Sequence, residues 1–340
     1  MPFKGTKIVI EFFVSKMFMI ILINNIIFVY YENHLLFMTI SLLIPVHNYD
    51  IMAFVSALRD CSDAILEFRE IIIGDDGSTE EIANKYKALE DDFVKVIRYS
   101  HNIGRAAIRN KLIEASTSDY LIFVDQDVML PESADIYMRK WVSSIGKAKV
   151  IFGGILYNDD PPSDPDKMLR WKYGRKFEQK SASERNKHPE RTFSTFNVMF
   201  DRSVFDILRF NEEIKQYGYE DTLFSYQLML AGISIYHIDN GLYHDGIETS
   251  QEFLDKTVVS LRNLSYIYNT ITNEKAFEGI IDIITKYKRL KSVGLHILVR
   301  RLFLHYKEAL ELRLNKPNPP LWIYGFYKIG LFCHFRCLNQ

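Results

Sequence analysis

The sequence predicts an α/β fold, in which a mostly parallel β-sheet is flanked by helices and followed by a helical C-terminal extension. From residue 39 onward, short apolar runs alternate with segments of helical spacing, which is typical of a parallel sheet with helices on both faces. The run at 120–124 is continuously apolar, as expected for a strand that is covered on both faces. We expect three parts, which are a hydrophobic N-terminal extension at 1–37, the α/β domain at 38–264 and a basic helical extension at 265–340.

Each element of this fold has its own local signal. Strands are expected at 39–46, 70–74, 93–99, 120–124, 150–157, 195–200 and 233–238, and helices at 51–61, from 78, at 104–115 and at 222–230. The helix that begins near Ser78 has acidic residues in its first turn, where the helix dipole stabilises them. Gly232 is suited to end the helix before it. Residues 158–191 are polar and have two prolines near their start, so we expect a mobile loop or lid.

The composition of the 340 residues is that of an ordinary globular protein. It is 48% hydrophobic and 25% charged, which allows a large core. The formal net charge of −1 gives no reason to expect a nucleic-acid partner. The three cysteines are too few for a disulfide framework, so a reducing, cytoplasmic setting is expected.

The N-terminal residues 1–37 allow three interpretations. Residues 17–31 are apolar except for two asparagines, and this run is shorter than a spanning helix needs. A weak membrane anchor, an additional helix and a segment upstream of the true start all remain open. We favour the third, because Met38 stands directly before the first strand.

The C-terminal residues 286–340 are strongly basic, with eleven Lys or Arg against Glu308 and Glu311. One helical face is marked by Leu290, Val293, Ile297, Leu302, Tyr306, Leu310 and Leu314, and several aromatic residues follow it. A basic amphipathic helix of this kind indicates peripheral attachment to an anionic membrane surface. The alternative is a helix that packs on the domain with its charges in solvent.

Polar residues gather where the predicted strands end. Pro45, Asp75-Asp76 and Asp125 to Asp127 all stand at carboxyl ends of strands or in the loops that follow, and ligands bind parallel sheets at this edge. Asp125 and Asp127 are two residues apart, so their side chains can point the same way. Two such carboxylates suit Mg²⁺ or Mn²⁺ with a phosphorylated ligand, although a solvated turn would also explain them.

With these residues assembled, the chain resembles the family 2 glycosyltransferases of the GT-A fold over residues 38–264. The motifs that carry the resemblance are I-P-V-H-N (44–48), G-D-D-G-S (74–78), N-I-G-R-A-A-I-R-N (102–110), D-Q-D (125–127), G-Y-E-D (218–221) and L-Y-H-D-G (242–246). The stretch 193–221 also looks like the carboxyl part of galactosyltransferase-type domains. The resemblance implies a Rossmann-like, mostly parallel sheet.

The resemblance also implies a donor site. It assigns the nucleotide to Pro45, His47, Asn48, Asp75, Asp76, Arg109 and Asp125, and the metal to Asp125, Asp127 and His244. The two residues Asp75 and Asp76 would contact the base, with uracil expected, and the ribose. Arg109 would lie near the diphosphate, because a guanidinium pairs well with phosphate oxygens. Two carboxylates and an imidazole suit Mn²⁺ somewhat better than Mg²⁺. For His244 alone, packing in the core would be the ordinary explanation.

Asp221 is the expected catalytic base. Transfer with inversion needs a carboxylate that takes the proton of the acceptor hydroxyl as its oxygen attacks the anomeric carbon. The alternative role for Asp221 is to cap a helix. Glu220 is expected to orient the acceptor. Gly153, Gly154 and Asn197 are expected to shape the pocket for the donor sugar or acceptor.

The expected function is metal-dependent, inverting transfer of a single sugar from a nucleotide sugar to a hydroxyl of a cell-surface glycan or lipid-linked acceptor. A UDP-sugar is the expected donor, and polysaccharide biosynthesis is the expected setting. Single addition is expected because the Gln-x-x-Arg-Trp motif of processive synthases is not matched; Arg170-Trp171 lies before Asp221 and follows Lys167. The alternatives are a non-catalytic protein that binds sugar nucleotides or glycans, and a sugar-phosphate nucleotidyltransferase. The expected location is the cytoplasm, with attachment to the inner face of the cytoplasmic membrane left open.

Overall fold

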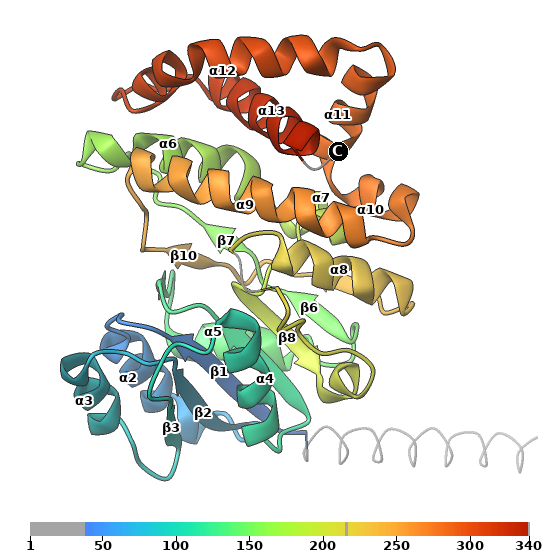
Figure 1. Ribbon diagram of the computed structural model, residues 1–340. Helices are drawn as coiled ribbons and strands as arrows, with labels where there is room; N and C mark the ends of the chain where they lie inside the picture. The colour runs from blue at the N-terminus through green and yellow to red at the C-terminus, as the bar shows by residue number, and fades with distance from the viewer. Residues whose placement is uncertain (1–37, 215–216, 339–340) are drawn as a thin grey trace, which may run out of the picture. The chain divides into compact units, whose positions relative to one another are not determined.

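The computed structural model describes residues 38–214 and 217–338 (Figure 1). The chain divides into two compact units, Met1–Thr39 and Ile40–Gln340, and all of the described helices and strands belong to the second. The expectations for residues 1–37 lie outside the described residues.

The centre of the protein is a seven-stranded sheet. Its order is β3 (Val94–Arg98), β2 (Phe68–Asp75), β1 (Ile40–Val46), β4 (Tyr120–Val124), β8 (Asn197–Asp201), β6 (Val150–Phe152) and β9 (Ile235–His237). Strand β8 runs antiparallel to both of its neighbours, and the other pairs in the sheet are parallel. All residues of β4 are buried, as its unbroken apolar run predicts. The predicted α/β architecture with a mostly parallel sheet is therefore confirmed.

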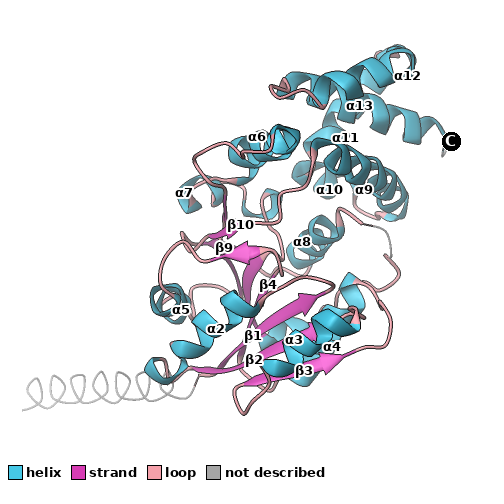
Figure 2. Ribbon diagram, turned by 90° about the vertical axis from the view of Figure 1, so that its left-hand side faces the viewer, coloured by secondary structure: helices cyan, strands magenta, loops and turns pink. Residues whose placement is uncertain are grey.

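Helices cover both faces of this sheet. Figure 2 shows α2 (Met52–Asp60) and α5 (Ala134–Val142) on one side, and α4 (Arg105–Ala115) and α8 (Glu220–Leu230) on the other. Helix α3 (Glu80–Ala88) joins β2 to β3. On the side of α4 and α8, the core is rich in phenylalanine, and the rings of Phe210 and Phe224 stack with centroids 4.5 Å apart. This packing fixes the start of α8 against the sheet.

A second sheet of three short strands lies at the carboxyl end of β4. It contains β5 (Val128–Met129), β10 (Leu242–His244) and β7 (Ile155–Leu156), with β10 in the middle. The prediction of one strand at 150–157 is therefore wrong. The chain leaves the large sheet at Gly153 and Gly154, where the φ of Gly154 is +112°, and then enters the small sheet.

The segment 158–191, which is expected to be a mobile loop or lid, has regular structure over much of its length. This segment contains η2 (Pro165–Lys167), α6 (Met168–Tyr173), the π-helix η3 (Gly174–Glu178), α7 (Ala182–Arg185) and η4 (Pro189–Arg191). Leu169 has no exposed surface, and the hydroxyl of Ser250 donates to the carbonyl of Asp166 at 2.6 Å. The polar residues that suggested a loop are held by partners elsewhere in the chain.

Helices make up the rest of the chain. They are α9 (Ser250–Thr270), α10 (Glu274–Ile280), α11 (Asp282–Ser292), α12 (Leu295–Leu314) and α13 (Leu321–Leu338), and in Figure 1 α6 and α9 lie between the sheet and the pair α12 and α13. The expected domain boundary at residue 264 falls inside α9. The same core continues from α9 into α13, where the Thr257 and Tyr324 hydroxyls hydrogen-bond at 2.8 Å.

The expected single amphipathic face at 290–314 is divided between two helices. Gly294, with a φ of +74°, ends α11 and lets α12 start in a new direction. The aromatic residues of α13 at 324, 327, 332 and 335 are buried in the helical core, whereas several apolar side chains of α12 are exposed. Among the described helices, none is both long and apolar enough to cross a bilayer.

Candidate active site

The loops after β1, β2 and β4 are tied together at the carboxyl edge of the sheet. The backbone N–H of His47 donates to Oε1 of Gln126 at 2.7 Å, and the Nδ1 of His47 lies 2.9 Å from the carbonyl oxygen of Asp76. Parallel strands bring their carboxyl ends to one edge, so residues that are far apart in sequence meet here. The convergence expected from the sequence is present in the structure.

A cavity of about 330 Å³ opens at this edge. Its walls include Pro45, His47, Asp76, Arg109, Asp125 and Asp127, which are six of the residues expected at the donor site. The carboxylate of Asp76 accepts the backbone N–H groups of Ile103, at 2.6 Å, and Gly104, at 3.2 Å. Asp76 therefore fixes the turn before α4, which in turn carries Arg105 and Arg109 into the cavity.

Asp75 and Asn48 hold the loops behind this cavity. Asp75 has no exposed surface; its Oδ1 accepts the Ser78 N–H at 2.9 Å, and its Oδ2 lies 3.5 Å from Nε of Arg98. The Oδ1 of Asn48 accepts the Thr79 N–H at 2.8 Å. Neither residue lines the cavity, so the structure does not bring Asp75 or Asn48 to the position expected of a nucleotide contact.

Asp125 is paired with a buried arginine. The Nη2 of Arg109 donates to Oδ1 of Asp125 at 3.1 Å, and Arg109 is only 4% exposed. Burial raises the pKa of Asp125, and the nearby Asp127 charge raises it further, while Arg109 acts in the opposite direction. The Nε of Arg109 is buried without a hydrogen-bond partner among the described residues. An anionic ligand in the cavity would satisfy this cation.

Asp127 is held by the segment that carries His244. The Nε2 of His244 lies 3.1 Å from Oδ2 of Asp127, and the backbone N–H of Asp245 donates to the carbonyl of Asp127 at 2.9 Å. Burial acts to raise the pKa of Asp127, but the hydrogen bond and charge of His244, together with a backbone hydrogen bond and the Arg105 charge, outweigh burial and lower it. Gly246 packs directly on the Asp127 side chain, where a Cβ atom would lie 2.8 Å from Oδ2.

The spacing of this pair suits a shared cation. Ligands about 2.1 Å from an octahedral Mg²⁺ lie about 3 Å from one another, close to the 3.1 Å between the Asp127 and His244 atoms. The Nδ1 of His244 is also buried without a partner in the described part of the chain. The separation of the Asp127 and His244 atoms, which is also that of a hydrogen bond, is compatible with a divalent metal. Within residues 38–214 and 217–338, however, no group of three His, Cys, Asp or Glu residues is assembled for a metal, since Asp125 is turned to Arg109.

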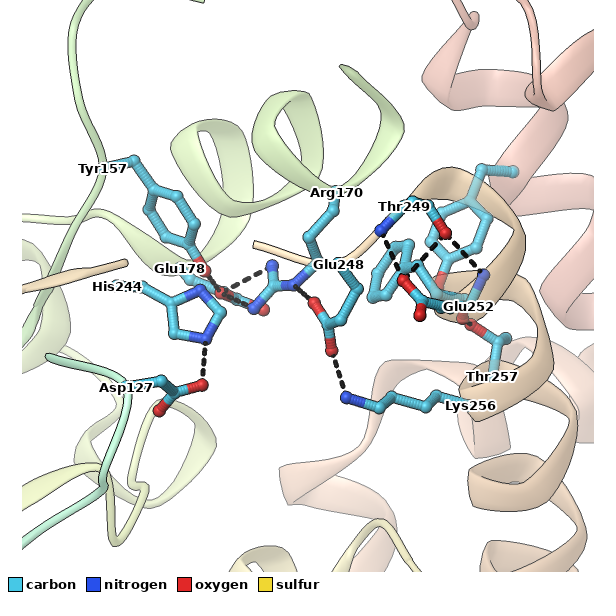
Figure 3. A network of polar contacts seen from close by, with 12 residues as sticks. Asp127, Tyr157, Arg170, Glu178, His244, Glu248, Thr249, Glu252, Lys256 and Thr257 are labelled. Atoms are coloured by element: carbon cyan, nitrogen blue, oxygen red, sulfur yellow. Dashed lines mark hydrogen bonds and ion pairs between the residues drawn. The ribbon is translucent and has the colours of Figure 1, made fainter. Parts of the chain in front are cut away.

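An ionic network that was not expected from the sequence contacts His244 through the ring of Tyr157 (Figure 3). The rings of Tyr157 and His244 have centroids 5.7 Å apart, and the Tyr157 hydroxyl donates to Oε2 of Glu178. Arg170 lies between two carboxylates, with Nη2 3.0 Å from Glu178 and Nε 3.2 Å from Glu248. Although burial acts to raise the pKa of Glu178, the Arg170 guanidinium holds it below its usual value. Arg170 had only been considered as part of an incomplete processivity motif.

Asp221 is fixed by hydroxyl and backbone donors. Its Oδ2 accepts from the Ser194 hydroxyl at 2.9 Å and the Thr195 N–H at 3.0 Å, and its Oδ1 accepts from the Thr195 hydroxyl at 2.9 Å. The preceding Tyr219 has a φ of +66°, a left-handed conformation that is uncommon outside glycine. The Ser194-Thr195 dipeptide was missed because its contact with Asp221 spans 26 residues.

Glu220 lies beside Asp221 in a different environment. Its Oε1 is 3.6 Å from Nη1 of Arg105, and its Oε2 is buried without a partner among the described residues. Burial and the Asp221 charge raise the pKa of Glu220, with Arg105 opposing them. Both carboxylates line a second cavity of about 400 Å³, together with His244 and Asp127. The first cavity and the second share Arg105, Asp125 and Asp127, so the two meet at the D-Q-D motif.

Three expected pocket residues are not at either cavity. Gly153, Gly154 and Asn197 were expected to shape the sugar pocket, but they form a packed hydrogen-bonded core. Asn197 has no exposed surface, accepts from the Tyr137 hydroxyl at 2.8 Å and donates to the Asn240 carbonyl at 2.7 Å. A Cβ at Gly153 would lie 2.5 Å from Nδ2 of Asn197. The glycines allow close packing in the sheet, which corrects their assignment to the pocket.

The sequence of the chain is similar to a known family and to curated proteins. Residues 41–208 match the family model described as Glycosyl transferase family 2. The chain is 26% identical over 222 residues to a Bacillus subtilis (strain 168) protein named as glycosyltransferase EpsH, covering 62% of this chain and 61% of that protein. It is 30% identical over 134 residues to a poly(ribitol-phosphate) beta-glucosyltransferase of Bacillus spizizenii, covering 34% of this chain and 20% of that protein. The chain thus spans less than two thirds of either relative.

Solved structures of similar architecture include two that cover most of the chain. Glucosyl-3-phosphoglycerate synthase from Mycobacterium tuberculosis, in complex with Mn²⁺, UDP and glucosyl-3-phosphoglycerate, aligns with a TM-score of 0.48 and 16% identity, over 68% of this chain and 80% of that one. Residues 1–349 of TarS from S. aureus align with a TM-score of 0.44 and 16% identity, over 89% of this chain and 92% of that one.

Proposed function

We propose that this chain, whose residues 41–208 match the family model described as Glycosyl transferase family 2, is a glycosyltransferase that moves a single sugar from a nucleotide sugar to an acceptor hydroxyl. The proposed donor is a UDP-sugar and the proposed acceptor is a cell-surface glycan or a lipid-linked molecule. We propose that the reaction inverts the anomeric carbon and depends on Mn²⁺ or Mg²⁺. The residues 38–264 are proposed to form the catalytic domain, with α9 shared between it and the C-terminal helices.

One observation carries this proposal, which is that two cavities meet at Asp125 and Asp127. The first is walled by the loops after β1, β2 and β4 and contains Arg109, whose buried guanidinium suits a diphosphate. The second contains Asp221 and Glu220. With a donor in the first cavity and an acceptor in the second, the bond between the sugar and the diphosphate would lie beside the D-Q-D motif. The arginines of the first cavity would then be on one side of this bond and the Glu220-Asp221 pair on the other.

The residues of the chain can then perform the displacement. The acceptor oxygen attacks the anomeric carbon while its proton passes to a carboxylate of Asp221, which Ser194 and Thr195 hold in place. The electron pair of the broken carbon–oxygen bond leaves with the nucleoside diphosphate. Arg105 and Arg109 lie on the same wall and would stabilise the charge on this leaving group.

A divalent cation is proposed to bind Asp127 and His244, with Asp125 beside them. When bound, such a cation neutralises the negative charge that develops on the leaving diphosphate. The 3.1 Å spacing of the Asp127 and His244 atoms supports this assignment. The backbone contact from Asp245 and the packing of Gly246 would keep Asp127 in a fixed orientation.

We also propose that the enzyme works in the cytoplasm, at the inner face of the cytoplasmic membrane. The support comes from α12, where the apolar side chains of Leu295, Ile297, Leu298, Leu302, Leu304 and Tyr306 are more than a third exposed. Arg301 is exposed on the same helix, and basic residues near apolar ones favour anionic lipid surfaces.

A thermal-shift and calorimetry panel tests the donor assignment. UDP, GDP, CMP and dTDP are each added to the full chain, with and without Mn²⁺. A ligand that binds only the folded state raises its stability in proportion to RT ln(1 + [L]/Kd), so the donor nucleotide is expected to raise the melting temperature above the others. We expect a Mn²⁺-dependent response to UDP. A response to a different nucleotide would change the donor, and no response to any of the four would contradict the proposal.

A further inference from the structure

A third cavity, of about 590 Å³, lies between the segment 173–192 and the C-terminal helices. It shares walls with the cavity that contains Asp221, and the shared residues are Tyr173, Phe177, Arg191, Thr192, Tyr219 and Thr222. Two of these, Tyr219 and Thr222, flank the Glu220-Asp221 pair on the chain. A molecule bound in this cavity would therefore extend directly toward the proposed base.

The cavity is strongly cationic. Its lining includes Lys180, Arg185, Lys187, Arg191, Lys286 and Lys328 against two carboxylates, Glu184 and Asp282. Some of these cations are already occupied. Arg185 donates to backbone carbonyls, Arg191 lies 3.2 Å from Asp282, and Lys180 lies 3.7 Å from Glu184. No carboxylate pairs with the remaining three, Lys187, Lys286 and Lys328, among the described residues.

Lys328 of α13 is the most unusual of the three. Its ammonium lies over the rings of Tyr173, at 4.6 Å, and Tyr324, at 4.8 Å, and it donates to the Tyr173 hydroxyl at 3.3 Å. Burial lowers the pKa of Lys328 to about 8, with Glu178 opposing this effect from a distance. Lys328 is partly buried, and the two tyrosines leave most of the hydrogen-bonding capacity of its ammonium unused.

We propose that this cavity binds a phosphate group of the acceptor, with Lys328, Lys187 and Lys286 as its partners. This inference rests on the proposed function and specifies its acceptor as a phosphorylated molecule. A phosphate monoester or diester supplies charge and acceptor oxygens for three ammonium groups, which a neutral glycan does not. The nucleoside diphosphate has its own arginines in the first cavity, so it does not account for these lysines. Lys328 makes the C-terminal helices part of the substrate site.

Calorimetry with sn-glycerol 3-phosphate on the full chain tests the inference, with glycerol as the neutral comparison. We expect the wild type to bind glycerol 3-phosphate and not glycerol. Lys328→Gln is expected to weaken this binding about tenfold, as loss of a charge-assisted hydrogen bond would, and Lys328→Arg to retain it. Lys286→Gln, at an exposed position that is safe for folding, is expected to weaken it less. The control Lys147→Gln changes an exposed lysine outside the cavity and is expected to leave the affinity unchanged.

Binding of UDP with Mn²⁺ is measured on the same preparations and is expected to be equal in all of them. If glycerol 3-phosphate does not bind, or if Lys328→Gln binds it as the wild type does, the phosphate site is refuted while the UDP result leaves the proposed function standing. If the wild type binds none of UDP, GDP, CMP and dTDP, the proposed function itself fails. The bound phosphate could belong to a lipid headgroup or to a soluble acceptor, and co-sedimentation with vesicles of equal parts phosphatidylglycerol and phosphatidylcholine distinguishes these two sources. Lys328-dependent vesicle binding indicates a lipid headgroup phosphate, and binding of glycerol 3-phosphate alone indicates a soluble phosphorylated acceptor.

Discussion

Gly246 packs so closely on Asp127 that a Cβ atom at position 246 would lie 2.7 Å from the Cβ of Asp127. The contact joins the L-Y-H-D-G motif to the D-Q-D motif across more than one hundred residues. Real Cβ atoms do not approach one another this closely, so any side chain at 246 would have to displace the Asp127 side chain or the backbone.

Gly246→Ala is therefore expected to weaken Mn²⁺-dependent binding of UDP about tenfold or more, because it moves Asp127 away from His244. Calorimetry with UDP, with and without Mn²⁺, measures this effect. Gly279→Ala is the matched control, since a Cβ at Gly279 in α10 meets nothing within 4 Å. This control should leave binding unchanged and stabilise the helix by about 0.5–1 kcal/mol. Unaltered Mn²⁺-dependent binding in Gly246→Ala would argue against Asp127 as a metal ligand.

Asp221→Asn is expected to lower kcat by about 10²–10⁴-fold, the range over which a general base contributes, while UDP binding is retained. Glu220→Gln is the matched comparison, because Glu220 is the adjacent carboxylate with the raised pKa. It is expected to raise KM for the acceptor more than it lowers kcat. If Glu220→Gln abolishes turnover and Asp221→Asn does not, the two roles are exchanged.

Arg170→Met is expected to destabilise the fold by about 1–3 kcal/mol, because Glu178 would lose its cation in a partly buried site, whereas Glu248 would keep Lys256. Urea unfolding followed by circular dichroism measures the change. Arg139→Gln is the control; Arg139 forms an exposed pair with Asp135 in α5, and such pairs contribute about 0–1 kcal/mol. Equal effects of the two substitutions would show that the network behind His244 does not stabilise the protein.

His237 is expected to make the fold sensitive to acid. Burial, followed by the Arg185 charge, lowers its pKa to about 4 from 6.5. The unfolded chain binds the proton first, so stability is intact above pH 6.5 and is lost as the pH falls toward 4. This one group should cost about 2 kcal/mol between pH 7 and pH 5. Urea titrations at the two pH values should show a smaller loss for His237→Gln than for the wild type, and an equal loss would exclude His237 as the cause.

The paired substitution Leu298→Glu with Leu302→Glu is expected to reduce sedimentation with vesicles of phosphatidylglycerol and phosphatidylcholine. It removes two exposed apolar side chains of α12 and adds two charges, each worth about 1 kcal/mol of repulsion at an anionic surface. Leu66→Glu, at a position that is 75% exposed near β2, is the control. If the wild type does not sediment with these vesicles, the proposed membrane attachment is wrong.

Apolar runs in the sequence, and the polar motifs that follow them, predicted several strands of the central sheet and the positions of their carboxyl ends. The strands β1, β2 and β4 have continuous apolar runs, and their carboxyl ends were identified because a polar motif follows each run directly. The pairing of Asp127 with His244 was expected only from the resemblance to a family, since the two residues are 117 apart. No periodicity in a single sequence reports a contact across that distance.

The expectations for residues 158–191 and for Gly153-Gly154 differ from the structure for the same physical reason, which is a contact with a segment distant in sequence. Residues 158–191 look like a loop because they are polar and have two prolines near their start, but Arg170 in this segment pairs with Glu178 and Glu248. The pair Gly153-Gly154 looks like a place for a ligand to approach, yet Asn197 lies against Gly153 and Arg185 lies against Gly154. In both cases the partner that decides the environment lies on a distant segment, and only the assembled structure identifies it.

The pairing of β5 with β10 in the small sheet determines when the contacts around Asp127 can form during synthesis of the chain. Strand β5 leaves the ribosome early, but its partner at Leu242–His244 follows more than one hundred residues later. Until that strand emerges, Asp127 has neither His244 nor Asp245 beside it, and the D-Q-D loop of a nascent chain remains unpaired. A fragment that ends with the family-matching region at residue 208 would contain the sheet strands from β1 to β8 and yet lack every contact that fixes Asp127. Assembly of the contacts around Asp127 is therefore a late event, completed only after a long-range strand pairing of the kind that forms slowly.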